Sequence, residues 1–266
     1  MHDAAYYIQL LLSGVTVGSL YALIAIGYTM VYGILRLINF AHGDIFMMAG
    51  FFMVYISASC SLAVSIPLVL LLTVLLGVAI EKAAYKPLRT APRMSVMISA
   101  IGVSYLLQNL ANYITGGIAR AYPDIPFLTQ VLNIGGLNIK RITIVTPILT
   151  IALVAVLVIL IQKTKIGMAM RAVSRDFETS QLMGIKINSV ISMTFVIGSF
   201  LAAVFGGIGS IPGAVIGAFI IGICESFIKA NENIAVFSNA FTFALLIVIL
   251  LCKPNGLFGE KLTEKV

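Results

Sequence analysis

The feature that most constrains this chain is a series of long, uninterrupted apolar runs. Of its 266 residues, 60% are hydrophobic and only 10% are charged, and the mean hydropathy is +1.08. A soluble globular domain has about 25% charged residues. The apolar runs do not alternate every second residue, which excludes a transmembrane β-barrel. The sequence therefore predicts an all-α, polytopic transmembrane bundle of about seven or eight spans, forming a single domain over residues 1–266.

The apolar runs give the approximate positions of the spans. They cover residues 6–31, 45–57, 63–80, 94–114, 144–161, 190–205, 211–227 and 236–252. The longer polar loop over residues 115–143 contains Gly135-Gly136, and we expect a small hairpin around this pair within residues 131–144.

Basic residues concentrate in two loops between the spans. One loop has Lys82, Lys86, Arg89 and Arg93, opposed only by Glu81; the other has Lys163, Lys165, Arg171, Arg175 and Lys186. Short loops rich in Lys and Arg stay in the cytoplasm, which places both loops there and the N-terminus outside. The net charge of +7 thus follows from membrane topology and does not indicate a nucleic-acid partner.

The last third of the chain does not satisfy this topology. An inside loop at Lys186 and an inside tail with Lys253, Lys261 and Lys265 require an even number of crossings, yet three apolar runs intervene. Either one run is re-entrant, or two runs form one bent span, or the tail lies outside.

Several features point away from other classes of site. The first five residues contain no Lys or Arg, so they do not resemble a secretory signal. Cys60, Cys224 and Cys252 have no metal-ligand spacing and read as small buried hydrophobes. We expect Glu81 and Glu225 at the membrane interface and an aromatic belt at the span ends, formed by Tyr6, Tyr7, Tyr28, Tyr32, Tyr55, Tyr85 and Tyr113. No catalytic triad, phosphate-binding loop or metal site is predicted, and no cofactor.

A polar hexapeptide, Asn39-Phe40-Ala41-His42-Gly43-Asp44, interrupts the apolar sequence between the first two expected spans. Polar side chains inside a membrane cost free energy, so a functional role is the first hypothesis for them. Asn39, His42 and Asp44 are therefore candidates for the substrate pathway, at the start of a broken helix. The alternative is a cytoplasmic turn in which Asp44 only stabilises a helix N-terminus.

A glycine-rich stretch is the second candidate. Gly206, Gly207, Gly209 and Gly213 surround Pro212, and Gly217 follows at GxxxG spacing. Tight helix packing is the favoured interpretation. A re-entrant segment beside the pathway is the other.

The second basic loop is the third candidate. Read as a helix, it places Met168, Ala172, Leu182 and Met183 on a partly apolar face among charges. Such a helix could dock on a soluble partner through its exposed methionines, or lie on anionic lipid. The residues alone leave both open.

Several motifs, taken together, resemble a known family. GVTVGSLYALIAIGYTMVYG over residues 14–33 and INFAHGD over residues 38–44 closely resemble branched-chain amino acid ABC transporter permeases of the LivH type. SAIG at 99–102, GxAxRA at 167–172, TFVIG at 194–198 and GGIGSIPGA at 206–214 match in the same order. The resemblance extends over essentially the whole chain.

The resemblance implies a role that spacing does not show. The chain would be one of two related permease subunits in the bacterial inner membrane. Two cytoplasmic ABC ATPases would dock on them and hydrolyse ATP, and a periplasmic binding protein would deliver leucine, isoleucine or valine. Residues 163–188 would be the cytoplasmic coupling segment, with Gly167, Arg171, Ala172 and Gly184 as its candidate contacts. Membrane lipid would be the other partner.

One departure from the family stands out. In the family about one membrane span separates the motifs at 194–198 and 206–214, but here only residues 199–205 intervene. An internal deletion near 199–205 would explain the uneven number of crossings. Three alternatives stay open: the same family with urea, short amides or other amino acids as substrate, an inactive truncated paralogue, or an ion-coupled secondary transporter or channel that works without ATPases.

Overall fold

The structure is a computed structural model, which describes residues 4–35, 39–89, 91–118, 121–122, 125–134, 137–205, 211–231 and 234–252. Helices account for nearly all of these residues, because a chain in lipid must satisfy its backbone hydrogen bonds internally. The first half contains α1 (Ala4–Leu35), α2 (Ala41–Ser57), α3 (Leu62–Ile80), the π-helical turn η1 (Glu81–Tyr85), the 3₁₀ turn η2 (Lys86–Leu88) and α4 (Arg93–Thr115). The second half contains α5 (Pro126–Thr129), β1 (Val131–Ile134), β2 (Leu137–Lys140), α6 (Arg141–Lys163), α7 (Lys165–Arg175), α8 (Phe177–Leu182), α9 (Ile187–Phe205), α10 (Ile211–Lys229), the 3₁₀ turn η3 (Ala235–Phe237) and α11 (Ser238–Cys252).

The helical membrane bundle predicted from the apolar runs is confirmed. Among the described residues, four helical stretches are long and apolar enough to cross a membrane, namely Tyr6–Ile26, Leu62–Leu88, Met94–Thr115 and Arg141–Lys163. Ala41–Ser57, Ile187–Phe200 and Ala235–Leu245 are shorter apolar helices.

The described chain divides into two compact units. One unit comprises Met1–Ile26, Ile125–Ala152 and Ile208–Val266, and the other comprises Gly27–Asp124 and Leu153–Gly207. We refer to them as the terminal unit and the central unit. The candidate site residues that the structure describes fall in the central unit, apart from Pro212, Gly213 and Gly217.

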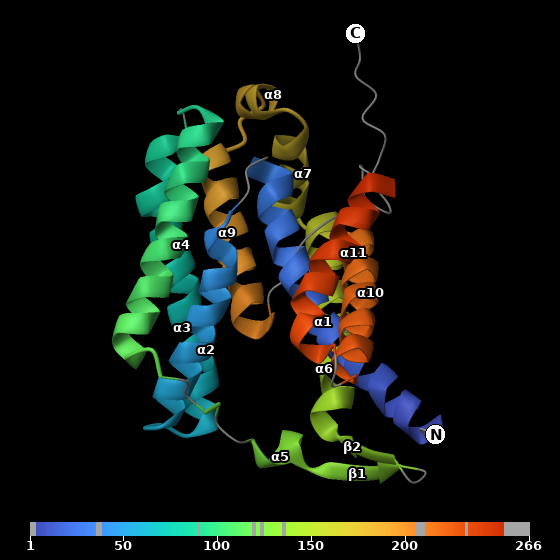
Figure 1. Ribbon diagram of the computed structural model, residues 1–266. Helices are drawn as coiled ribbons and strands as arrows, with labels where there is room; N and C mark the ends of the chain where they lie inside the picture. The colour runs from blue at the N-terminus through green and yellow to red at the C-terminus, as the bar shows by residue number, and fades with distance from the viewer. Residues whose placement is uncertain are drawn as a thin grey trace. The chain divides into compact units, whose positions relative to one another are not determined.

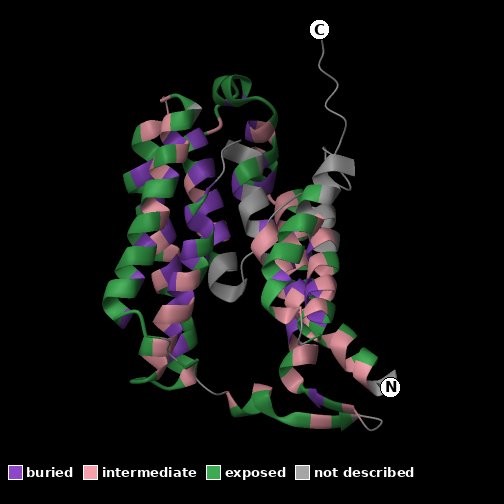
Figure 2. Cartoon of the chain, viewed as in Figure 1, coloured by how far each residue is buried: buried purple, intermediate pink, exposed green. Residues whose placement is uncertain are grey.

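The central unit is built on α2, α3 and α9, which pack against one another, with α4 against α2 (Figure 1). Their facing sides are buried, whereas much of α4 is exposed (Figure 2). α7 also packs on α9. The shared core consists of apolar side chains from these elements, from η1 and from the end of α1: Val31, Ile45, Met48, Ile80, Ala84, Tyr85, Val96, Ala100, Leu107, Ala111, Met170, Val173, Ile187, Val190, Ile191 and Phe195.

The terminal unit depends on close backbone approach between α1 and α10. A Cβ atom on Gly222 would lie 2.3 Å from the Gly18 backbone nitrogen, and one on Gly14 would lie 2.8 Å from the Ile223 Cα. Small residues at such spacing let membrane helices touch through their backbones. The Gly14-x-x-x-Gly18 motif therefore faces α10. α11 also packs on α10.

Local sequence accounts for the element boundaries. α4 ends at Gly116, whose φ of +66° is the left-handed conformation that favours glycine, and its N–H bonds to the Asn112 carbonyl. Pro87 and Pro92 lie between α3 and α4, where they prevent one continuous helix. The predicted hairpin is confirmed: β1 and β2 pair antiparallel with Asn133 opposite Asn138.

Two sequence expectations are wrong. Cys60 is exposed rather than buried, because it lies in the turn between α2 and α3 and not within a span. Tyr85 does not belong to an aromatic belt; only 3% of it is exposed, and its ring packs 5.0 Å from that of Phe195. Gly206, Gly207 and Gly209 lie outside the described residues. Pro212 and Gly213 fall in the first turn of α10.

Candidate functional site

The polar hexapeptide lies at the turn that leads into α2. Asn39 is 1% exposed, and its Oδ1 accepts hydrogen bonds from the Ala41 N–H (3.1 Å) and the Tyr85 hydroxyl (2.6 Å). The first bond is the local turn that asparagine side chains commonly form. The second ties the start of α2 to η1, and hence to the end of α3.

His42 and Asp44 follow in the first turn of α2. Their side chains are 2% and 8% exposed, respectively. Asp44 Oδ1 accepts a hydrogen bond from Gln108 Nε2 of α4 at 3.0 Å. The three pathway candidates therefore lie close in the chain, but Asn39 and Asp44 bond to different neighbouring helices.

Residues 163–188, the predicted coupling segment, form not one helix but two. α7 and α8 are separated at Asp176, whose extended backbone (φ −148°, ψ 113°) ends the first helix. Asp176 then caps the second helix by accepting from the Thr179 N–H at 3.1 Å and from the Thr179 hydroxyl. These hydrogen bonds lower the pKa of Asp176, chiefly through the hydroxyl, so the capping carboxylate stays ionised at neutral pH.

The α6–α7 corner is equally well defined. Thr164 caps α7, its Oγ1 accepting from the Gly167 N–H at 3.1 Å. Gly167 packs so closely on α6 that a Cβ atom would lie 2.2 Å from the Ile161 carbonyl oxygen. Gly167 therefore lets α7 pack directly against the end of α6.

The other coupling candidates occupy distinct positions. Arg171 is exposed, with Nη2 donating to the Gln162 carbonyl at 3.3 Å, and Ala172 is half-buried. Gly184, with φ of +81°, forms the turn after α8. Most of the apolar side chains expected on the exposed face are indeed exposed, with Met168 at 60%, Leu182 at 86% and Met183 at 78%. Met170 and Val173 bury the opposite face of α7 in the core.

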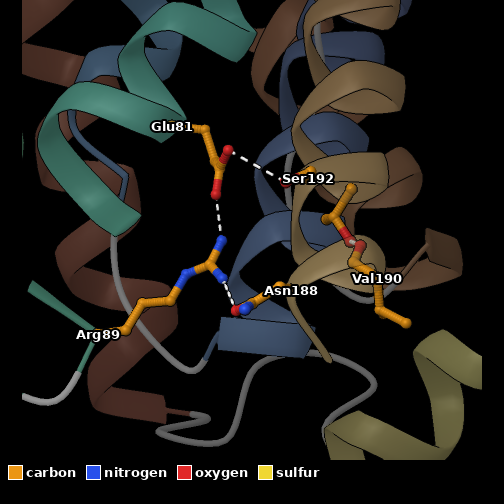
Figure 3. A network of polar contacts seen from close by, with 6 residues as sticks. Glu81, Arg89, Asn188, Val190 and Ser192 are labelled. Carbon is orange, nitrogen blue, oxygen red and sulfur yellow. Dashed lines mark hydrogen bonds and ion pairs between the residues drawn. The ribbon is translucent and has the colours of Figure 1, made fainter. Parts of the chain in front are cut away.

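A polar network beside this segment was missed by the sequence analysis (Figure 3). Glu81 is fully buried and forms an ion pair with Arg89, while its other oxygen accepts from the Ser192 hydroxyl at 3.1 Å. Arg89 also donates to Asn188 Oδ1. The lone acidic residue in a basic loop was the available signal, but sequence spacing could not show that its partners come from α9.

A second buried carboxylate lies in the terminal unit. Glu225 is 4% exposed, accepts a 2.6 Å hydrogen bond from the Tyr21 hydroxyl and forms an ion pair with Lys229 one turn later. Both Glu81 and Glu225 are thus packed within the protein and compensated. Among the described residues, no cluster of three His, Cys, Asp or Glu side chains could hold a metal ion.

Comparison with known proteins decides the family. Residues 10–205 match the family described as the permease component of branched-chain amino acid transport systems. The permease BraD of Pseudomonas aeruginosa is 35% identical, with all of both chains aligned. LivH of Escherichia coli K12 is also 35% identical, over 98% of each chain, and a probable LivH of Methanocaldococcus jannaschii is 25% identical over 94% of this chain and 92% of its own. The chain belongs to the branched-chain amino acid permease family.

The permease is accordingly a multi-pass inner-membrane subunit of an ABC transport system and not an enzyme in its own right. No solved structure shows a significant match to it.

The permease is also shorter than its relatives. Its alignment with BraD extends over 309 positions, although the chain has 266 residues. The difference exceeds the ~20 residues of one membrane span. The family match ends at residue 205, at the end of α9.

Proposed function

We propose that this permease is one membrane subunit of an ATP-driven importer of branched-chain amino acids. Similarity to BraD and LivH over the entire chain supports this proposal, because both are described as parts of high-affinity branched-chain amino acid transport systems. A second, related permease subunit completes the pathway, and a periplasmic binding protein delivers the substrate. Two cytoplasmic ABC ATPases hydrolyse ATP and drive alternating access.

Residues 163–188, the coupling segment, receive the ATPases. The segment combines exposed apolar side chains with exposed basic ones, as an adaptable protein-docking surface requires. A helix lying on lipid would instead bury its apolar side in acyl chains. In this segment the buried side of α7 already packs on the protein core, so Met168, Leu182 and Met183 form a separate surface.

Reversing the charge of Arg171 tests the coupling assignment. We expect Arg171→Glu to lower leucine uptake at least about tenfold, equivalent to roughly 1.4 kcal/mol of coupling free energy. Arg171 is exposed, and a negative charge at this position would repel an ATPase surface that is complementary to the positive one. Uptake and co-purification of the ATPases are measured in proteoliposomes with the complete transporter. Arg171→Lys keeps the charge and serves as the control. Normal assembly and uptake by Arg171→Glu would refute the assignment.

Asn39, His42 and Asp44 remain our pathway candidates, and Asp44 offers the sharpest test. Asn has nearly the same shape as Asp and keeps an oxygen that accepts from Gln108, so Asp44→Asn removes only the charge. If the carboxylate attracts the substrate ammonium group, uptake should fall about tenfold with assembly unchanged. Unchanged uptake kinetics would leave Asp44 a helix-stabilising residue and exclude it from the pathway.

A second candidate function is favoured by the shortened chain. If the missing residues, which we place near residues 199–205, include part of the pathway, the protein is a transport-inactive paralogue that still assembles with partner subunits. The same proteoliposome assay distinguishes the two functions. Wild-type chain that binds the ATPases but imports no leucine supports the paralogue, and ATP-dependent uptake supports the transporter.

A further inference from the structure

The end of α3 departs from regular helix at the residue that anchors the polar network. Glu81 opens the π-helical turn η1, a rare geometry that is frequent at functional sites. Its carboxylate is directed towards the first turns of α9 rather than towards solvent (Figure 3).

The network joins three segments of the central unit through two charged side chains. Glu81 contributes from η1, Arg89 from the loop before α4, and Asn188 and Ser192 from α9. Glu81 is 0% exposed and the Arg89 side chain 16%. Removing either partner therefore leaves a poorly solvated charge, whereas an apolar pair of similar volume could pack as stably. Stability alone does not explain the ion pair.

The same residues border the end of the coupling segment. A cavity of about 680 Å³ is lined by Arg89 and Asn188 together with Phe177 and Gln181 of α8 and the turn at Gly184. If Arg89 separates from Glu81, water in this cavity can therefore hydrate its guanidinium group. An apolar pair that separated there would gain no such hydration, so its separation would cost more. Only three residues separate Gly184 from Asn188, so a displacement of α8 reaches the network directly.

We propose that Glu81, Arg89 and Asn188 form a latch that transmits movement of the coupling segment to α3 and α9. The proposal rests on the proposed function, because the movement is driven by the ATPases. In this arrangement the three residues are positioning residues. They touch neither substrate nor nucleotide, and they determine how much transport each ATP hydrolysis produces.

The test compares uncharged single variants with an apolar pair in the complete transporter. Glu81→Gln and Arg89→Gln should each lower leucine uptake per ATP hydrolysed about tenfold, within the usual range of coupling between sites. The double variant Glu81→Leu/Arg89→Met should recover the thermal stability of the wild type but not its uptake per ATP. Lys86→Gln, an exposed cation in the same loop, is the control and should change neither quantity.

The outcomes separate the latch from a purely structural ion pair. Recovery of both stability and uptake per ATP by the apolar pair overturns the latch, as does normal coupling in both single variants. If the single variants fail to fold, the apolar pair still decides. A wild-type chain that does not bind ATPases, or binds them without ATP-dependent uptake, overturns the proposed function, and the latch with it. If the wild type couples ATP hydrolysis to uptake and the variants do so equally well, only the latch is overturned.

Discussion

Gly222→Val should destabilise the permease by about 3 kcal/mol or more, at the upper end of the cost of overpacking. A Cβ atom at this position would lie 2.3 Å from the Gly18 nitrogen and 2.4 Å from the Gly18 Cα. Both atoms are backbone, so no change of side-chain rotamer can relieve the clash. α1 and α10 would have to separate, which would also stretch the 2.6 Å hydrogen bond between Tyr21 and Glu225.

Thermal unfolding of the detergent-purified protein measures this effect, and Gly217→Val is its matched control. Gly217 lies in the same helix, and a Cβ atom there meets nothing within 4 Å among the described residues. Valine and glycine differ by less than about 1 kcal/mol in intrinsic helix propensity. Equal melting temperatures for the two variants would show that α1 and α10 do not touch through their backbones.

The glycine motif shows how far sequence reasoning extends. Gly14 and Gly18 have the spacing that permits close helix approach, and the structure shows such a contact with α10. The identity of the partner could not be predicted, because α10 lies two hundred residues further along the chain and is itself small-residue-rich, as are other helices. Periodicity describes one helix face, whereas a contact depends on two faces and the topology that joins them.

Tyr85 and Glu81 show the opposite case. Their positions near the end of an apolar run predict a membrane interface, since such residues usually lie there. Here the π-helical turn re-aims both side chains inwards, where Tyr85 bonds to Asn39 and Glu81 to Arg89. One extra residue per turn changes the direction of every following side chain, and the sequence shows no signal for it.

The structure of residues 163–188 was predicted in part. The exposed apolar side chains follow from hydrophobic spacing. The division of this segment into two helices depends on Asp176, which favours a cap over a helix interior because its short side chain bonds to nearby backbone N–H groups. The Asp-x-x-Thr spacing was present in the sequence, but a continuous helix fitted the hydrophobic pattern equally well.

Gly167→Val should detach the coupling segment from its support while leaving the spans packed. The new Cβ atom would lie 2.2 Å from the Ile161 carbonyl oxygen and 2.4 Å from that of Leu160. Because α7 must move away from α6, the Thr164 cap is lost and Met170 leaves the core. We expect co-purification with the ATPases and leucine uptake to fall at least about tenfold, with a stability loss of about 1–3 kcal/mol.

Two comparison variants distinguish displacement of the coupling segment from a general loss of protein stability. Thr164→Ala removes the cap and the hydroxyl's hydrogen bond to the Leu160 carbonyl without a clash, and should cost about 1 kcal/mol with a smaller loss of uptake. Gly102→Val adds the same side chain to α4 at a site with nothing within 4 Å among the described residues, and should leave ATPase binding unchanged. If Gly167→Val binds the ATPases normally, the α6–α7 corner does not position the docking surface. If Gly102→Val also loses them, the defect reports general instability rather than a displaced coupling segment.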